Sequence, residues 1–226
     1  MIRSLISLNR NVSRRIGTSF PSFFGGPSYY EVLLGSIQKA INSKYEPVVL
    51  EVGGVNRPLL QRSSQFHYVG VDIDDQPDCH SLYDRFVVQS VEKTMPVKAD
   101  IILSITLLEH VANNTSAAKS IFESLNGGGS THHYVPSKWH PYAICLRIVG
   151  PAMQRFLIRH LRPEAVGVSG YPTYFDFCTP KTMKRLFEDW FSRCQGNPLL
   201  QGHRLLLLFR PGVHSCSDLR EFNLLV

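Results

Sequence analysis

The sequence lacks the features of a membrane-spanning, disulfide-linked or zinc-binding protein. No apolar run in its 226 residues approaches the roughly 20 needed to cross a bilayer. The five cysteines form no C-x-x-C pair, so we predict neither a disulfide framework nor a metal site. No Gly-x-Ser-x-Gly elbow supports a nucleophilic triad. We therefore expect a soluble protein of a reducing compartment, the cytoplasm.

The chain carries no strong excess of one charge. Its 24 Lys and Arg stand against 18 Asp and Glu, giving a net charge of +6, and the basic residues are spread along the sequence. This distribution predicts a solvated surface and gives no strong nucleic-acid signal. Peripheral contact with a membrane surface stays open as an alternative, and the sequence does not indicate an oligomeric state.

The first 27 residues have no acidic side chain but contain Arg3, Arg10, Arg14 and Arg15. We interpret residues 1–27 as a flexible basic extension, with an organelle transit peptide as the alternative. Residues 28–226, in a chain that is 43% hydrophobic, are long enough for one well-filled core. We therefore expect a single domain over 28–226.

Helix and strand patterns alternate along this domain. A capping-box spacing at Ser28 and Glu31 predicts a helix that runs to about Ile41. Short apolar runs predict five strands, and a sixth is expected near the end of the chain: 48–52, 68–73, 85–88, 101–105, 131–135 and 205–209. Such alternation indicates an α/β fold with a doubly wound, mostly parallel sheet, whose ligands bind at the carboxyl ends of the strands.

Several helices are expected between and after these strands. Asn56 could begin a short helix bearing Pro58–Leu60, and Asn114 or Thr115 a longer one that Gly127–Gly129 ends. Residues 139–149 and 153–161 have helical patterns, so we expect a helical lid insertion over about 137–170. Thr179 and Pro180 begin a further helix, buried through Met183, Leu186, Phe187 and Trp190.

A glycine turn and an acid follow the first two strands. Gly53 and Gly54 end the first strand, and Asp72 ends the second, about 20 residues after Glu51. A turn without bulky side chains lets backbone N–H groups approach a nucleoside, and a carboxylate on the next strand accepts hydrogen bonds from its ribose hydroxyls. This spacing predicts a nucleoside site.

Four segments in order carry a resemblance to a known family. Residues 48–54 (VVLEVGG), 69–74 (VGVDID), 99–111 (ADIILSITLLEHV) and 125–129 (LNGGG) are similar to the motifs of class I S-adenosylmethionine-dependent methyltransferases, of the type 11-like group. The resemblance spans about residues 48–136 and implies a seven-stranded Rossmann-like sheet. It implies S-adenosylmethionine as the cofactor and methyl transfer as the activity.

The resemblance also implies roles for individual residues. Glu51, Gly53 and Gly54 would form the floor beneath the methionine portion, Asp72 would hold the ribose, and Ile73 would pack on the adenine. Ser90 and Val91 would lie in the loop that contacts the adenine, and Ser104 and Leu107 would lie beside the methionyl chain. Glu109 and His110 would face the methyl acceptor.

Three positions depart from the family. Val55 and Arg57 stand where later glycines are expected, and Ser90 replaces the usual adenine-binding acid. These departures motivate one alternative, a catalytically degenerate protein that retains the S-adenosylmethionine fold. The glycine turn and ribose acid alone also fit a second alternative, an NAD-dependent oxidoreductase.

The chemistry of methyl transfer leaves the acceptor open. Positioning supplies much of the rate enhancement, but a hydroxyl or acidic carbon also needs a base, for which His110 or Glu109 is the first choice. His132, His133 and His140 are further candidates; the first two are adjacent on a strand and so point to opposite faces. An aromatic group near the expected acceptor side favours a small-molecule or lipid-like acceptor: Trp139, Tyr142, Phe156, Tyr171, Tyr174 and Phe175.

Overall fold

The computed structural model describes residues 29–138, 171–193, 204–210 and 220–225. Its helices are α3 (Tyr29–Asn42), α4 (Cys79–Leu82), the 3₁₀ helix η1 (Leu108–His110), α5 (Asn114–Glu123) and α7 (Pro180–Arg193). Its strands are β1 (Val48–Val52), β2 (His67–Asp72), β3 (Arg85–Val88), β4 (Ala99–Ile105), β5 (Leu125–Pro136), β6 (Arg204–Arg210) and β7 (Arg220–Leu225).

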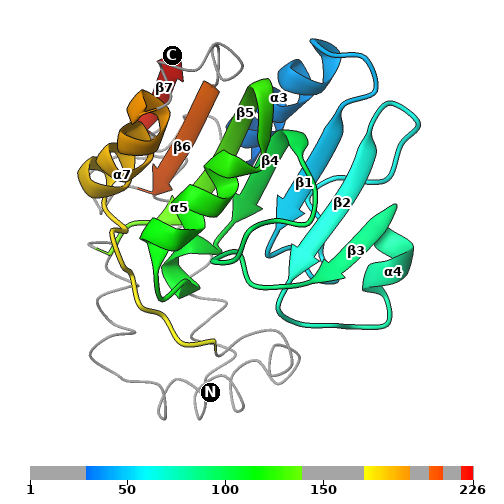
Figure 1. Cartoon of the computed structure of the whole chain (residues 1–226), viewed down its shortest axis with the longest axis horizontal. Coiled ribbons are helices and arrows are strands. Elements are labelled where there is room, and N and C mark those ends of the chain that lie inside the picture. Colours follow the sequence, from blue (N-terminus) through cyan, green and yellow to red (C-terminus); the bar gives the residue numbers. More distant parts are fainter. Residues whose placement is uncertain (1–28, 139–170, 194–203, 211–219, 226) are drawn as a thin grey trace, which may run out of the picture.

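The strands form one seven-stranded sheet in the order β3-β2-β1-β4-β5-β6-β7. Every neighbouring pair is parallel except β6 and β7. In Figure 1, α5 and α7 lie in front of the sheet and α3 lies behind it. The strand order reverses beside β1, so the loops after β1 and β4 diverge at the carboxyl edge, where such sheets bind ligands. The predicted doubly wound, mostly parallel fold is confirmed.

Alternating residues of the strands build a core on each face of the sheet. Leu50 and Ile102 pack toward α5 and α7, whereas Val49 and Ile101 pack toward α3, and all four side chains are fully buried. Each such burial stabilises the fold by about 1.5–3 kcal/mol. Both faces being covered explains why these strands are continuous apolar runs in the sequence.

Most predicted elements occur where the sequence patterns place them. β1 and β3 have the predicted bounds, and α7 begins at Pro180 with the Thr179 side chain accepting a hydrogen bond from the Thr182 amide at 3.2 Å. α5 is capped one residue earlier than predicted, by Asn113, whose side chain accepts from the Ser116 amide at 3.0 Å. The glycines at 127–129 do not end this helix but lie inside β5, where the register with β4 shifts.

The short helix predicted after Asn56 is wrong. The Leu59 amide donates to both carboxylate oxygens of Glu51, at 3.1 and 3.0 Å, and the Leu60 amide donates to the Tyr68 hydroxyl at 3.2 Å. These distant side chains satisfy the backbone donors that a helix would otherwise need to pair. The segment is therefore held as an irregular loop.

Some predictions fall on residues outside the described ranges. They include Ser28, the extension over 1–27 and all but the first two residues of the insertion over about 137–170.

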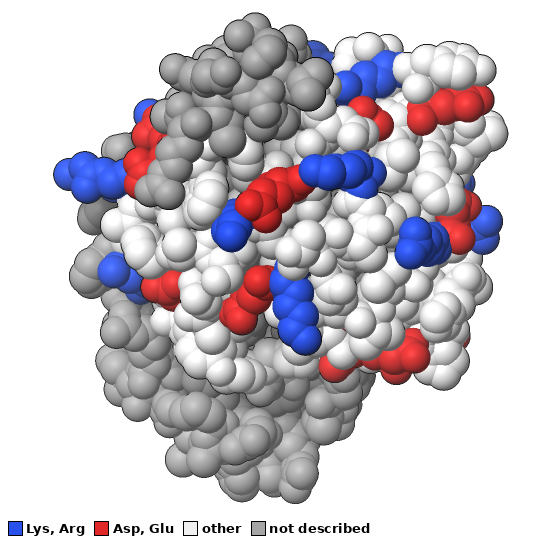
Figure 2. Space-filling model, in the orientation of Figure 1, with Lys and Arg blue, Asp and Glu red and all other residues white. Residues whose placement is uncertain are grey.

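None of the described helices is long and apolar enough to cross a bilayer. On the face shown in Figure 2, basic side chains are interspersed with acidic ones. This arrangement agrees with the solvated surface expected from the sequence.

Candidate functional site

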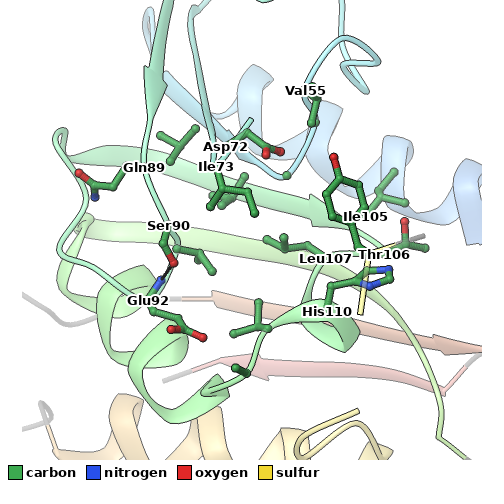
Figure 3. Close-up of a pocket in the computed structure, with 18 of the residues that line it drawn as sticks. Val55, Asp72, Ile73, Gln89, Ser90, Glu92, Ile105, Thr106, Leu107 and His110 are labelled. Carbon is green, nitrogen blue, oxygen red and sulfur yellow. Dashed lines mark hydrogen bonds between the residues drawn. The ribbon is translucent and has the colours of Figure 1, made fainter. Parts of the chain in front are cut away.

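A cavity of about 370 Å³ opens at the carboxyl edge of the sheet, where the strand order reverses. Two walls face each other across it. The first wall is the turn after β1 and the tip of β2, residues 53–57 and 72–73, and the second wall is formed by residues 105–107 and 110 of the loop after β4. Figure 3 shows Asp72, Ile73 and Ser90 toward one end of the cavity and Thr106 and His110 toward the other. The volume falls in the range of small-molecule sites.

The turn of the first wall depends on close backbone approach. Gly53 has a φ of +84°, and a Cβ built on it would lie 2.8 Å from Cδ1 of Leu107 in the second wall. A side chain here would be strained in conformation and would collide with the facing loop. Val55 has a φ of +44°, so it adopts the left-handed backbone for which glycine is usual. The turn closes with the Arg57 amide donating to the Gly54 carbonyl at 2.9 Å.

The tip of β2 places an acid beside an exposed apolar side chain. Asp72 is buried, and this burial raises the pKa of its carboxyl. Its Oδ1 accepts from the Asp74 amide at 3.0 Å, which holds the carboxyl at the strand end. Ile73 lines the cavity and is 60% exposed. An exposed isoleucine in a concave site offers an apolar surface that a flat ligand can cover.

Glu51 lies behind the glycine turn and does not line the cavity. It is 3% exposed and accepts hydrogen bonds from the Leu59 amide and the Tyr68 hydroxyl. Burial raises the pKa of Glu51 to about 7. Oε1 of Glu51 would lie 2.7 Å from a Cβ built on Gly54, so this glycine leaves room for the carboxylate. Glu51 therefore supports the turn from below.

The second wall carries the histidine that the sequence singled out. His110 lines the cavity, and its Nδ1 lies 3.0 Å from the carbonyl oxygen of Pro172. Because a carbonyl can only accept, Nδ1 donates and Nε2 is the proton-accepting nitrogen of the neutral ring. Burial lowers the pKa of His110, which favours that neutral form. Tyr171 lies edge-on to the ring at a centroid distance of 6.2 Å.

Glu109 precedes this histidine and does not line the cavity. It is 4% exposed, and burial raises its pKa to about 8. Its Oε1 lies 3.8 Å from Nε2 of His110, while no described residue forms a hydrogen bond with its buried Oε2. The Glu109 carbonyl accepts from the amides of Tyr174 and Phe175 at 2.9 and 3.0 Å. The second wall is thereby fastened to residues 171–175.

The structure brings together eight of the eleven site residues predicted from the sequence. Those that line the cavity are Gly53, Gly54, Asp72, Ile73, Ser90, Val91, Leu107 and His110. Glu51, Glu109 and Ser104 lie behind its walls, and Ser104 Oγ is 2.8 Å from Nδ1 of His133. Of the predicted aromatic group, Tyr171 and Tyr174 line the cavity, Phe175 is buried in the core, and the other three lie outside the described residues.

Several lining residues were not singled out by the sequence. The main ones are Gln89, Glu92 and Thr106. Glu92 places an acid in the loop where Ser90 replaces the usual one, and its Oε1 accepts from the Asn113 amide at 2.8 Å. The sequence signal that could have identified Glu92 is its place two residues after Ser90, the position aligned with the family's adenine-binding acid. Thr106 has a φ of +49°, in the left-handed region, and no sequence pattern predicts this conformation for a threonine.

The neighbouring histidines of β5 point to opposite faces of the sheet, as predicted. Nδ1 of His132 lies 3.1 Å from Ser36 Oγ in α3, whereas the His133 ring packs on Phe187 of α7 at 5.4 Å. Burial lowers their pKa values to about 4 and about 3, so both rings are neutral at pH 7. Neither lines the cavity. Their place is in the core, and His140 lies outside the described residues.

The cavity fits an adenosyl group in three respects. The turn at Gly53 and Gly54 brings no side chain of its own into the cavity, Asp72 offers a carboxylate, and Ile73 offers an apolar surface beside it. A carboxylate accepts hydrogen bonds from vicinal hydroxyls, and an apolar side chain stacks on a base. The three features lie along one cavity, as a nucleoside requires.

A family model described as a methyltransferase domain matches residues 29–190. This match covers the cavity and most of the sheet. The chain therefore belongs to this methyltransferase family, which its motifs predicted. No curated protein matched the sequence.

Solved structures resemble the chain in part. The YcgJ protein from Bacillus subtilis is 17% identical with a TM-score of 0.45, over 71% of this chain and 68% of that one. A putative S-adenosyl-L-methionine-dependent methyltransferase from Methanococcus maripaludis is 12% identical with a TM-score of 0.41, over 74% and 76%. Coclaurine N-methyltransferase, solved with N-methylheliamine and S-adenosylhomocysteine, is 18% identical with a TM-score of 0.37. The match covers 44% of this chain and only 34% of that enzyme.

Proposed function

We propose that the protein transfers a methyl group from S-adenosylmethionine to a small-molecule or lipid-like acceptor at the cavity between the two walls. The observation that carries this proposal is the adjacency of buried Asp72 and 60% exposed Ile73 beside the Gly53 turn. Asp72 would accept hydrogen bonds from the ribose, Ile73 would cover the adenine, and Gly53 would admit the backbone contact. Family membership supports this function over an NAD-dependent oxidoreductase.

The second wall suits an acceptor that loses a proton. S-adenosylmethionine, when bound, supplies an activated methyl group that the acceptor atom displaces directly. His110 is neutral and donates through Nδ1 to Pro172, so its Nε2 is free to take the proton of a hydroxyl or a nitrogen. Glu109, 3.8 Å from Nε2, would stabilise the resulting imidazolium when ionised. His110 is thus the proposed catalytic base and Glu109 a positioning residue behind it.

The aromatic rim favours an acceptor with apolar surface. Tyr171 and Tyr174 line the cavity and are 37% and 55% exposed. Exposed aromatic rings that line a site can bind planar or apolar groups through their faces. These rings support a small organic or lipid-like molecule as the acceptor.

Calorimetric titration of the purified protein with S-adenosylmethionine and S-adenosylhomocysteine tests the cofactor assignment. We expect binding of both, and Asp72→Ala should weaken it by about 1.5–3 kcal/mol, the scale of a lost hydrogen bond to a charged group. Asp78→Ala is the matched control, because Asp78 is an exposed acid near the site that does not line the cavity. Wild-type protein that binds neither ligand at millimolar concentration would favour a degenerate fold.

The acceptor itself is best sought in the protein as purified. Mass spectrometry of small molecules released on denaturation should show a compound that gains 14 mass units when the protein and S-adenosylmethionine are added back to it. His110→Gln should then lower the rate of that reaction by about 10²–10⁴-fold, the contribution of a general base. A rate unchanged by this substitution would remove His110 from the base role.

A further inference from the structure

Residues 171–178 follow a path that is fixed by hydrogen bonds to the loop after β4. In Figure 1 they begin the yellow stretch that leads to α7. The Glu109 carbonyl accepts from two amides of this segment at 2.9 and 3.0 Å, and the buried Asn114 side chain donates to one of its carbonyls at 2.6 Å. Phe175 has a φ of +52°, which a bulky residue adopts only where its surroundings impose it. The segment is therefore held firmly beside η1.

Tyr171 and Pro172, at the start of this segment, contact opposite sides of the cavity. The Tyr171 hydroxyl donates a hydrogen bond to the carboxylate of Asp74, directly beyond the tip of β2. The carbonyl of the next residue, Pro172, accepts from Nδ1 of His110 in the second wall at 3.0 Å. In Figure 3, His110 lies across the cavity from Asp72 at the β2 tip. The two consecutive residues thus form a bridge between the walls.

The end of this bridge at β2 is tied to the residue that is proposed to hold the ribose. The Asp74 amide donates to Oδ1 of Asp72 at 3.0 Å. Burial and the hydrogen bond to Asp74 raise the pKa of Tyr171 to about 12, so its hydroxyl keeps the proton that it donates. Hydrogen bonds to an ionised group are about twice as strong as those between neutral groups. This contact can therefore hold the start of the segment in place.

From these contacts we infer that Tyr171 is a positioning residue for the proposed base, because its bond to Asp74 holds the Pro172 carbonyl against His110. The nitrogen of a histidine that carries the proton is set by the hydrogen bond that the ring makes. With Nδ1 bonded to Pro172, Nε2 of His110 is left as the accepting nitrogen. The inference rests on the proposed function for its catalytic meaning, since His110 is the base only there. It makes the tautomer of the base depend on a contact at the wall that is proposed to bind the cofactor.

Nitrogen NMR of the His110 ring tests this dependence in the full chain without any ligand. The shifts of Nδ1 and Nε2 give the ratio of the two tautomers, and His110→Gln identifies the signals among those of nine histidines. We expect the Nδ1–H form in the wild type. Tyr171→Phe removes only the hydroxyl and should lower the ratio of Nδ1–H to Nε2–H by about three- to tenfold, the effect of one lost hydrogen bond. Tyr174→Phe, at the other tyrosine among the described residues that line the cavity, should leave the ratio unchanged.

Asp74 provides the sharpest variants because it lies at the far end of the bridge from His110. Asp74→Ala should lower the tautomer ratio as much as Tyr171→Phe does. The double variant should lower it no further, since both substitutions remove the same hydrogen bond. Asp74→Asn keeps an acceptor and should recover part of the wild-type ratio. A side chain that only stabilised the fold would not give this pattern.

Melting curves establish that each variant is folded. The inference is overturned if the wild type carries the proton on Nε2, or if Tyr171→Phe and Asp74→Ala keep the wild-type ratio. It is also overturned if the effects of the two substitutions add in the double variant. Protein that shows the expected ratios but binds neither S-adenosylmethionine nor S-adenosylhomocysteine would support the bridge and overturn the proposed function, so the two failures are distinguishable.

Discussion

The two walls of the cavity each rest on a buried glutamate, and the two glutamates are held differently. Glu51, behind the first wall, has both carboxylate oxygens bonded by the Leu59 amide, and Tyr68 adds a second donor. Glu109, behind the second wall, has a buried Oε2 that no described residue bonds and an Oε1 3.8 Å from His110. The carboxyl of Glu51 is fully hydrogen-bonded within the fold, whereas Oε2 of Glu109 has no hydrogen bond from a described residue.

This difference assigns different work to the two walls. A satisfied buried group fixes a single conformation, as the rigid Gly53 turn requires. An unsatisfied one costs stability and persists where function needs it, as beside the proposed base His110. We therefore expect the first wall to bind the cofactor through a fixed backbone, and the second wall to keep, beside His110, a carboxyl oxygen that no described residue bonds.

The largest expected effect comes from removing the satisfied carboxyl. Glu51→Ala leaves the Leu59 amide and the Tyr68 hydroxyl without their acceptor and opens a void beneath the turn. We expect the free energy of unfolding in urea to fall by about 3–5 kcal/mol. Glu51→Gln keeps the volume and one acceptor, so its loss should be smaller. Equal losses in the two variants would show that the lost hydrogen bonds of the carboxylate matter and the void does not.

The unsatisfied carboxyl should reveal itself through pH. Burial raises the pKa of Glu109 from 4.5 to about 8, so the folded state binds a proton that the unfolded state has released. Stability from this group is therefore full below about pH 4.5 and is lost as the pH rises toward 8. Glu109→Gln should remove on the order of 3 kcal/mol from that decline between pH 5 and pH 8.

Urea melts at four pH values measure this slope in the wild type and in Glu109→Gln. Glu51, with a pKa raised to about 7, adds a decline of the same sign in both proteins, so the difference between them isolates Glu109. Identical slopes in the two proteins would mean that burial does not raise the pKa of Glu109, and the proposed role of this carboxyl in the second wall would fall.

The fold was largely predictable because its elements depend on local patterns. The apolar run Val48–Val52 and the acid at Asp72 are visible without knowledge of any partner. The helix predicted over Pro58–Leu60 failed because Glu51 and Tyr68, distant in the sequence, bind its amides. The strand Arg220–Leu225 was missed because its residues, REFNLL, carry no strong alternation and are placed by pairing with β6.

The site was predictable where a motif is continuous and unpredictable where it depends on contacts across the chain. The Gly53 turn and His110 lie within motifs, and both line the cavity. The orientation of His110 depends on the Pro172 carbonyl, 62 residues away, and Tyr171 donates to Asp74 across 97 residues. No spacing rule connects such pairs, so the tautomer of the proposed base could only follow from the structure.

A smaller effect is expected where the two walls touch. Gly53→Ala places a methyl group 2.8 Å from Leu107 Cδ1 at a φ of +84°, so stability should fall by about 2 kcal/mol and cofactor affinity with it. Gly128→Ala has a φ of +70° and nothing within 4 Å, and therefore measures the backbone strain alone. Gly35→Ala, exposed in α3, should stabilise slightly. If Gly53→Ala costs no more than Gly128→Ala, the walls are not in tight contact.

The smallest effect should distinguish strain from function in each wall. Val55 and Thr106, one from each wall, are β-branched residues at φ of +44° and +49°. A glycine at either position relieves backbone strain of about 1–2 kcal/mol in the folded state. It also lowers the free energy of unfolding by about 0.5–1 kcal/mol, because glycine has more conformational freedom in the unfolded chain. Val55→Gly and Thr106→Gly should therefore each raise the free energy of unfolding by about 0.5–1 kcal/mol. Because the Thr106 amide is anchored to the Tyr134 carbonyl at 3.0 Å, that loop should keep its path and its affinity for S-adenosylhomocysteine. A loss of affinity in Val55→Gly alone would mean that the first wall uses the Val55 side chain to keep the turn after Gly53 in its path.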